Sequence, residues 1–205
     1  PPVNLAEWTA DDYDRAAQKY CESLPLEHFM EATPQGAHRA ISLASLKLIE
    51  SRRRDFRVFN ELLVQYPINA HLGQVVPDNM VVLSKEPVQA MGSYNLPFEP
   101  AAPFWVLEYV SPSSQRKDYE DNFQKYQHEL KVPYYLLFYP EKQDLRLYRY
   151  TGSTYEQVEP NAHGRLSLRE VLGVPGLLAA QDRDGDGVVV LDEFPRRYQF
   201  RIGLG

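Results

Sequence analysis

The chain of 205 residues is predicted to adopt an α/β (α+β) fold, because short apolar runs of strand length alternate with longer segments of helical periodicity. Hydrophobic residues make up 43% of the sequence and charged residues 24%, a balance typical of folded globular domains. No apolar run approaches the ~18 residues that a membrane-spanning helix needs. We expect one domain over residues 1–174 and a separate tail over residues 175–205, where the character of the sequence changes.

Two helices are expected in the first quarter of the chain. A hydroxyl at Thr9 precedes two acidic residues, which is typical of a helix start, and this helix should extend to about Cys21. A second helix is predicted over Ala37–Arg52, where apolar residues form one broad face. Between the two helices, the short segment Leu26–Ala32 is expected to be a strand.

Five further strands are expected after the second helix. They are predicted at Arg57–Tyr66, Met80–Leu83, Phe104–Val110, Pro133–Tyr139 and Leu145–Tyr150. A helix of about 15 residues should connect the third of these strands to the fourth. This interleaving of strands and helices predicts a sheet that is covered by helices.

Charge and cysteine content exclude several classes of protein. The net charge of −6 does not favour a passive nucleic-acid coat, which is usually basic, but an acidic pocket in a nuclease could still hold Mg²⁺. Cys21 is the only cysteine, which excludes an internal disulfide and a Cys-rich zinc site and fits a reducing, cytoplasmic location. Because the chain begins at Pro1 rather than at Met, we expect it to be a fragment of a longer protein.

Two acidic residues lie at or within predicted strands. Asp78 follows a proline at the entrance to one strand, and Glu108 lies inside the apolar run Phe104–Val110. Charged groups are rarely buried without partners, and two carboxylates on adjacent strands can share a Mg²⁺ ion that activates water against a phosphate. The alternative is that Glu108 points to solvent or pairs with an arginine.

The predicted helix after Glu108 carries two neighbouring stripes. The apolar stripe consists of Tyr119, Phe123, Tyr126 and Leu130. The polar stripe, one residue earlier at each step, consists of Asp118, Asn122, Lys125 and Glu129. Because the polar stripe borders the buried one, it could line a cleft in which Lys125 contacts a scissile phosphate or orients the attacking water. The alternative is a solvated flank of the helix.

Taken together, several motifs resemble a known family. They are Val76–Val82, Phe104–Ser113, Arg116–Asp118, and Lys125–Tyr126 followed by Val132–Leu136. In this order they resemble the Uma-two family of restriction endonucleases, over roughly residues 24–174. The resemblance implies a restriction-endonuclease-like fold of the PD-(D/E)XK superfamily, which is a mixed central sheet flanked by helices. It also implies hydrolysis of phosphodiester bonds in DNA that depends on Mg²⁺ or Mn²⁺.

The resemblance also assigns individual residues. Asp78 matches the aspartate of the family's Pro-Asp motif, and Glu108 matches its second acid, so both are expected to bind the metal. Glu31 or Glu27 could supply a further acid before the long helix, and His38 matches a histidine that commonly opens that helix.

The sequence departs from the superfamily pattern at the lysine. Val110 stands where the superfamily has a lysine two residues after the second acid, and Asn122 stands where many family members carry one. Lys125 could substitute for it. For the nuclease, DNA is the expected substrate, and a homodimer is the expected assembly. The alternative function is a catalytically inactive domain that keeps the nuclease fold, binds a partner and has a calcium-binding tail.

The tail contains a pattern of its own. Residues 182–193 match the calcium-binding loop of an EF-hand, with Asp182, Asp184 and Asp186 as acidic ligands, the carbonyl of Val188 and a bidentate Glu193. Three acids so close in sequence would repel one another without a cation, which favours Ca²⁺ binding. The alternative is an Asp-Gly turn in a C-terminal hairpin.

Overall fold

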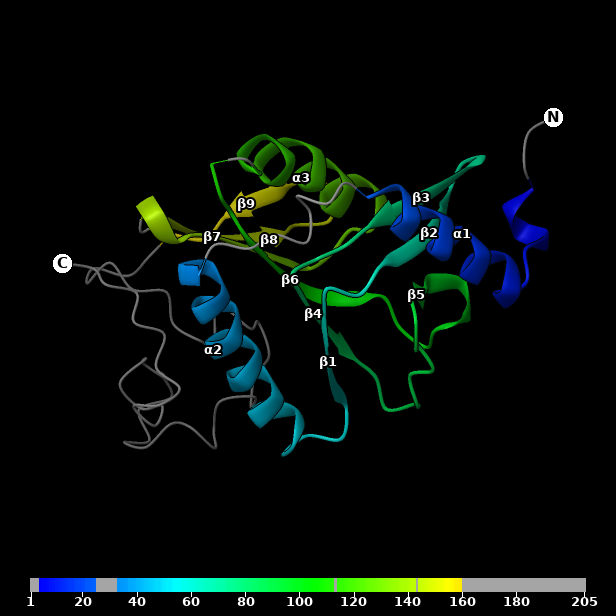
Figure 1. Cartoon of the computed structure of the whole chain (residues 1–205), viewed down its shortest axis with the longest axis horizontal. Coiled ribbons are helices and arrows are strands. Elements are labelled where there is room, and N and C mark those ends of the chain that lie inside the picture. The colour runs from blue at the N-terminus through cyan, green and yellow to red at the C-terminus, as the bar shows by residue number, and fades with distance from the viewer. Residues whose placement is uncertain (1–3, 25–32, 113, 143, 160–205) are drawn as a thin grey trace.

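The computed structural model describes residues 4–24, 33–112, 114–142 and 144–159, and its centre is a six-stranded mixed sheet (Figure 1). The predictions made for Leu26–Ala32, including Glu27 and Glu31, and for the tail with its EF-hand-like loop lie outside the described residues. Within them, no helix is both long and apolar enough to cross a membrane.

The central sheet has the strand order β1-β4-β6-β7-β8-β9. Its strands are β1 (Phe56–Asn60), β4 (Asn79–Leu83), β6 (Pro103–Tyr109), β7 (Tyr134–Tyr139), β8 (Asp144–Tyr150) and β9 (Tyr155–Gln157). Only the pair β6–β7 is parallel among these neighbours. Two parallel strands need a crossover connection, and the helical segment between them provides it. The expected α/β class with a mixed sheet is therefore confirmed.

A second sheet of three strands has the order β3-β2-β5, with β2 (Val64–Ile68), β3 (His71–Val75) and β5 (Tyr94–Asn95). The single strand predicted at Arg57–Tyr66 is wrong, because β1 and β2 belong to different sheets. The chain changes direction between them at Glu61, whose φ of 50° is in the left-handed region and ends the extended conformation. This break also places Glu61 beside the start of β4, where its N–H donates to the carbonyl of Asp78 at 3.2 Å.

The predicted helices are present with somewhat different bounds. Helix α1 (Ala10–Ser23) begins with a capping box in which Thr9 and Asp12 bond each other's backbone N–H groups, and α2 spans Thr33–Glu50. The third helical segment consists of two π-helical turns, η4 (Lys117–Asp121) and η5 (Lys125–Glu129), around the short α3 (Asn122–Gln124). Short 3₁₀ turns η1 (Leu5–Glu7), η3 (Leu96–Phe98) and η6 (Pro140–Lys142) complete the described elements.

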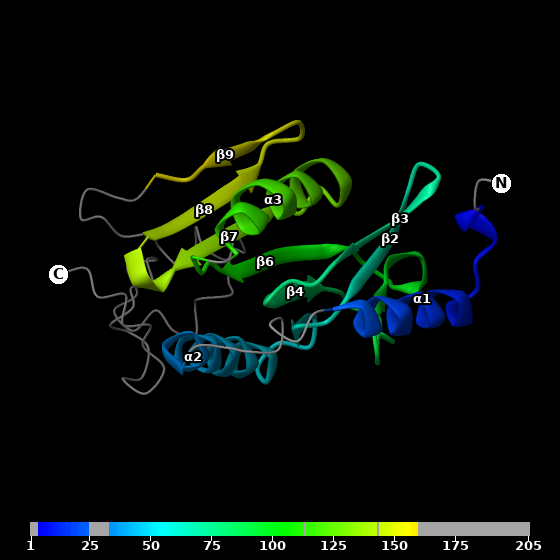
Figure 2. The same cartoon turned by 45° about the horizontal axis from the view of Figure 1, so that its top comes forward.

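Helices cover both faces of the central sheet, with α2 on one side and the segment around α3 on the other (Figures 1 and 2). Strand β6 alternates between these layers. Trp105, Leu107 and Tyr109 belong to the core under α2, whereas Val106 and Val110 pack in the core under the third helical segment. By the same alternation, Glu108 points to the side of the third helical segment. Because both sides of β6 are covered, its sequence is apolar throughout, and Glu108 is the exception.

Candidate active site

The pairing of β4 with β6 brings the two sequence-predicted carboxylates together. Asn79 is the antiparallel partner of Leu107, so continuing this register by one residue sets Asp78 opposite Glu108. The backbone N–H of Asp78 donates to Glu108 Oε2 at 3.4 Å, a long hydrogen bond that confirms their proximity.

Glu108 is buried and held by neutral groups of the third helical segment. Its residue is 1% exposed, and its Oε1 accepts hydrogen bonds from Tyr126 Oη at 2.6 Å and Asn122 Nδ2 at 3.0 Å. Burial raises the pKa of the Glu108 carboxyl well above its usual value, and the nearby charges of Asp78 and Asp118 raise it further. The alternative in which Glu108 points to solvent is therefore wrong.

A third carboxylate, Asp118, joins the pair. Asp118 is 2% exposed, and its oxygens accept hydrogen bonds from Ser114 Oγ at 2.6 Å and from Asn122 Nδ2 at 3.3 Å. Burial raises its pKa to about 6, although the hydrogen bond from Ser114 opposes the shift. We did not assign Asp118 to the site from the sequence, although its four-residue spacing from Asn122 in the polar stripe was the available signal.

Both oxygens of the Asp78 carboxylate have a donor. Oδ1 forms a salt bridge with Arg39 Nη2 of α2 at 2.7 Å, and Oδ2 accepts the backbone N–H of Tyr109 at 2.6 Å. Burial raises the pKa of Asp78, while the guanidinium of Arg39 acts against that increase. Asp78 therefore lies at the point where α2, β4 and β6 meet.

The structure does not place Lys125 with these acids. Its Nζ donates to the carbonyl of Gln74 in β3 at 2.8 Å, and Glu129, next in the stripe, accepts the hydroxyl of Tyr66 in β2 at 2.6 Å. The polar stripe therefore has two parts. Asp118 and Asn122 lie near Glu108, whereas Lys125 and Glu129 form hydrogen bonds with the smaller sheet. The prediction assumed a regular α-helix, and two π-helical turns change the direction of each side chain.

Lys117 is the lysine that interacts with the three acids. Burial would lower the pKa of its ammonium, but the charges of Glu108, Asp118 and Asp78 outweigh that effect, and the pKa is raised. Lys117 therefore keeps its positive charge at neutral pH. Sequence reasoning passed over it, although it directly precedes Asp118 in a motif of the family resemblance. The side chain of His38, in α2, lies outside the part of the chain that the structure describes.

The chemistry of the donor set fits a hard divalent cation. Asp78 and Glu108 offer carboxylate oxygens, and the mutual repulsion of three neighbouring acids would be relieved by a cation. Among the described residues no group of three or more His, Cys, Asp or Glu side chains is arranged so that it could hold a metal ion. Mg²⁺ does not need one, because it usually binds one or two carboxylates and keeps several waters.

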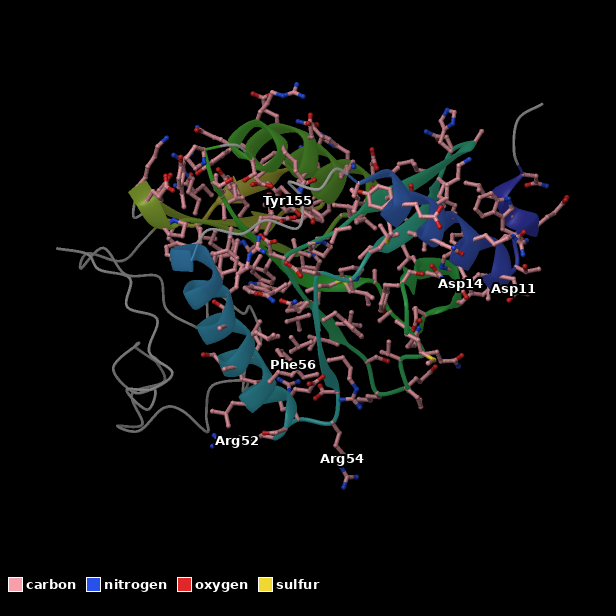
Figure 3. All side chains as sticks on the ribbon, in the orientation of Figure 1. Asp11, Asp14, Arg52, Arg54, Phe56 and Tyr155 are labelled. Carbon is pink, nitrogen blue, oxygen red and sulfur yellow. The ribbon has the colours of Figure 1, made fainter. Side chains whose placement is uncertain are left out.

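A run of three basic residues, Arg52–Arg54, lies away from the acid cluster. Arg52 and Arg54 lie in the turn between α2 and β1 (Figure 3), whereas Arg39 lies about 16 Å before the C-terminal end of α2, at 1.5 Å per residue. We therefore do not include the basic run in the candidate site.

Comparisons with known proteins identify the family to which the chain belongs. The model of the Uma2 (Uma-two) family, "Putative restriction endonuclease", matches residues 13–180. The crystal structure of a "putative nuclease belonging to DUF820" from Anabaena variabilis is 22% identical to this chain. The two have a TM-score of 0.49, and the match covers 70% of this chain and 83% of that one. The curated proteins gave no match. Because the family match extends over well more than half of the chain, this protein belongs to the Uma2 family.

Proposed function

We propose that the protein is an endonuclease that hydrolyses phosphodiester bonds of DNA with the help of Mg²⁺ or Mn²⁺. The observation that supports this most directly is Glu108, a carboxylate that is 1% exposed and lies beside Asp78. A buried acid of raised pKa next to a second acid is costly for folding, which makes a functional role the better explanation. Membership of a family described as restriction endonucleases supports the same function.

In this proposal Asp78 and Glu108 hold the cation. Tyr126 and Asn122 fix Oε1 of Glu108 and so leave Oε2, on the side of Asp78, for the metal. When bound, Mg²⁺ lowers the pKa of a coordinated water and stabilises charge on the phosphate.

Lys117 takes the place that we first gave to Lys125. Its ammonium is held positive by the acid cluster, and although that ammonium is partly buried, the residue as a whole is exposed to solvent. We propose that Lys117 carries out the charge stabilisation that the superfamily lysine usually provides, because Val110 and Asn122 cannot. We also propose Glu31, which lies outside the residues that the structure describes, as a further acid of the site.

A second candidate function is a catalytically inactive, DNA-binding domain of the same fold. It is favoured by the salt bridge between Asp78 and Arg39, which already neutralises one of the two metal-binding acids, and by the absence of a lysine at positions 110 and 122.

Cleavage assays separate the two functions. Supercoiled plasmid and single-stranded DNA are incubated with Mg²⁺ or Mn²⁺ and with wild type, Asp78→Asn, Glu108→Gln, Lys117→Met and Lys125→Met. We expect the two carboxamide variants to lose roughly 100-fold or more in rate and Lys117→Met to lose at least about tenfold, with Lys125→Met as the matched control near wild type. Cleavage that persists equally in all variants would refute the assigned site. DNA binding without cleavage by wild type would favour the second function.

A further inference from the structure

We propose that Arg39 is a resident counter-ion of the site that competes with the divalent cation for Asp78 and thereby sets the metal concentration the protein requires. This inference rests on the proposed function, because it takes Asp78 as a metal ligand. It concerns a residue of α2 that neither the family resemblance nor the chemistry of hydrolysis assigns.

The contacts of Arg39 place its charge directly at the metal-binding acid. Nη2 lies 2.7 Å from Asp78 Oδ1, and Nη1 lies 2.8 Å from Oε1 of Glu61. The guanidinium carbon lies 5.7 Å from the centre of the Tyr109 ring, within the range of a cation–π contact. The side chains of Arg39 and Asp78 are 24% and 14% exposed, so water screens their interaction only in part.

These contacts leave little of Asp78 for a metal. One carboxylate oxygen is bonded to Arg39 and the other to the backbone N–H of Tyr109. A divalent ion bound about 2 Å from either oxygen would lie roughly 5 Å from the guanidinium charge. At that separation, repulsion between a double and a single positive charge weakens binding roughly tenfold even with the screening of bulk water.

Glu61 offers Arg39 a second anchor beside the first. It is the more exposed partner, at 54%, and its backbone is fixed next to Asp78 by the hydrogen bond from its N–H to the Asp78 carbonyl. When a cation occupies Asp78, Arg39 keeps its bond to Glu61 and needs no new partner. Glu61 therefore favours the arrangement in which Asp78 is released, and its loss should hold Arg39 more firmly on Asp78.

The test measures Mn²⁺ binding by calorimetry at pH 8, without DNA, so that it does not depend on catalysis. We expect Arg39→Gln to bind Mn²⁺ about tenfold more tightly than wild type, Glu61→Gln to bind it more weakly, and Asp78→Asn to lose binding. Arg53→Gln removes an ion pair with Asp55 in the turn between α2 and β1 and serves as the matched control with wild-type affinity. Circular dichroism verifies that each variant is folded.

A double-mutant cycle separates competition by Arg39 from a general effect of charge. If Glu61 acts through Arg39, the Glu61→Gln change should have little effect in the Arg39→Gln background. Effects that simply add would overturn the role of Glu61. If Arg39→Gln does not fold, Arg39→Lys, which keeps the charge but not the two-pronged bridge, should bind within a few-fold of wild type or more tightly.

The possible results distinguish this inference from the proposed function. Equal affinity of wild type and Arg39→Gln, with binding lost in Asp78→Asn, would overturn the competition and leave the metal site standing. Weaker binding in Arg39→Gln would show that Arg39 only orients Asp78, which also overturns it. Binding by Arg39→Gln alone would support the inference in its strongest form. Absence of binding in every protein would refute the metal site and the inference with it.

Discussion

Replacing Asp118 with asparagine should stabilise the metal-free protein at neutral pH, because Asp118 is a buried acid whose pKa is raised from 3.8 to about 6. In the unfolded chain it ionises near pH 3.8, whereas in the folded chain it resists ionisation until about pH 6. Its contribution therefore favours folding at low pH, and this advantage is lost as pH rises through that window. One pKa unit corresponds to 1.36 kcal/mol, so the penalty at pH 7 is about 3 kcal/mol.

The substitution also has a cost. Asparagine weakens the hydrogen bond that Ser114 Oγ donates to the carboxylate at 2.6 Å, which removes about 1 kcal/mol. The net expectation is a gain of about 2 kcal/mol in the free energy of unfolding at pH 7, and a small loss near pH 4, where most of the penalty is absent. The sign of the difference between variant and wild type should change between those two pH values.

Urea unfolding in EDTA provides the measurement. Tryptophan fluorescence follows unfolding of both proteins at a series of pH values; it includes the signal of Trp105, which lies in β6 and is 3% exposed, together with that of Trp8. Subtracting the two curves removes the contribution of surface acids that the proteins share. A difference that does not vary with pH, or a variant that is less stable than wild type at pH 7, would refute the assignment of Asp118 as a destabilised acid.

Two further predictions address other parts of the molecule. Tyr126→Phe removes the 2.6 Å hydrogen bond to Glu108 Oε1. We expect chemical unfolding to show a free energy of unfolding lower by about 2 kcal/mol, and calorimetry to show weaker Mn²⁺ binding. Unchanged Mn²⁺ affinity would exclude Tyr126 as a positioning residue. We also propose that the C-terminal loop binds Ca²⁺, so calorimetric titration of wild type should release or absorb heat that Asp182→Ala abolishes. If wild type gives no heat, the Ca²⁺ proposal is refuted, and the Asp-Gly turn is the remaining interpretation of this segment.

Much of the fold could be predicted from local pattern. The interruption of an apolar run by Glu108 indicated a strand with an unusual acid, and the structure places that strand in the centre of the sheet with a helix-covered core on each side. The prediction of one strand at Arg57–Tyr66 was wrong because the sequence there is apolar enough to suggest a continuous strand. What divides it is the backbone conformation of Glu61, and glutamate carries no strong preference for the left-handed region.

The part of the candidate site that depends on strand pairing could be predicted from the sequence. The part that depends on helix geometry could not. Asp78 and Glu108 meet through the antiparallel register of β4 and β6, and the family-like motifs indicated that these two acids form a site. The choice between Lys117 and Lys125 depends on the winding of the third helical segment. A helical wheel assumes 3.6 residues per turn, whereas the π-helical turns bond each residue to one five positions away, so the wheel assigned Lys125 to the wrong surface.

The charges around the site bear on how an acidic chain would receive a nucleic acid under the proposed function. Asp78, Glu108, Asp118 and Glu61 face Arg39 and Lys117, so the cluster keeps two excess negative charges when all six groups are ionised. A divalent cation would neutralise that excess, so the cluster would no longer repel the negative charge of a phosphodiester. On this account metal binding and DNA binding are linked through the same residues, and the net charge of −6 for the whole chain has little bearing on either.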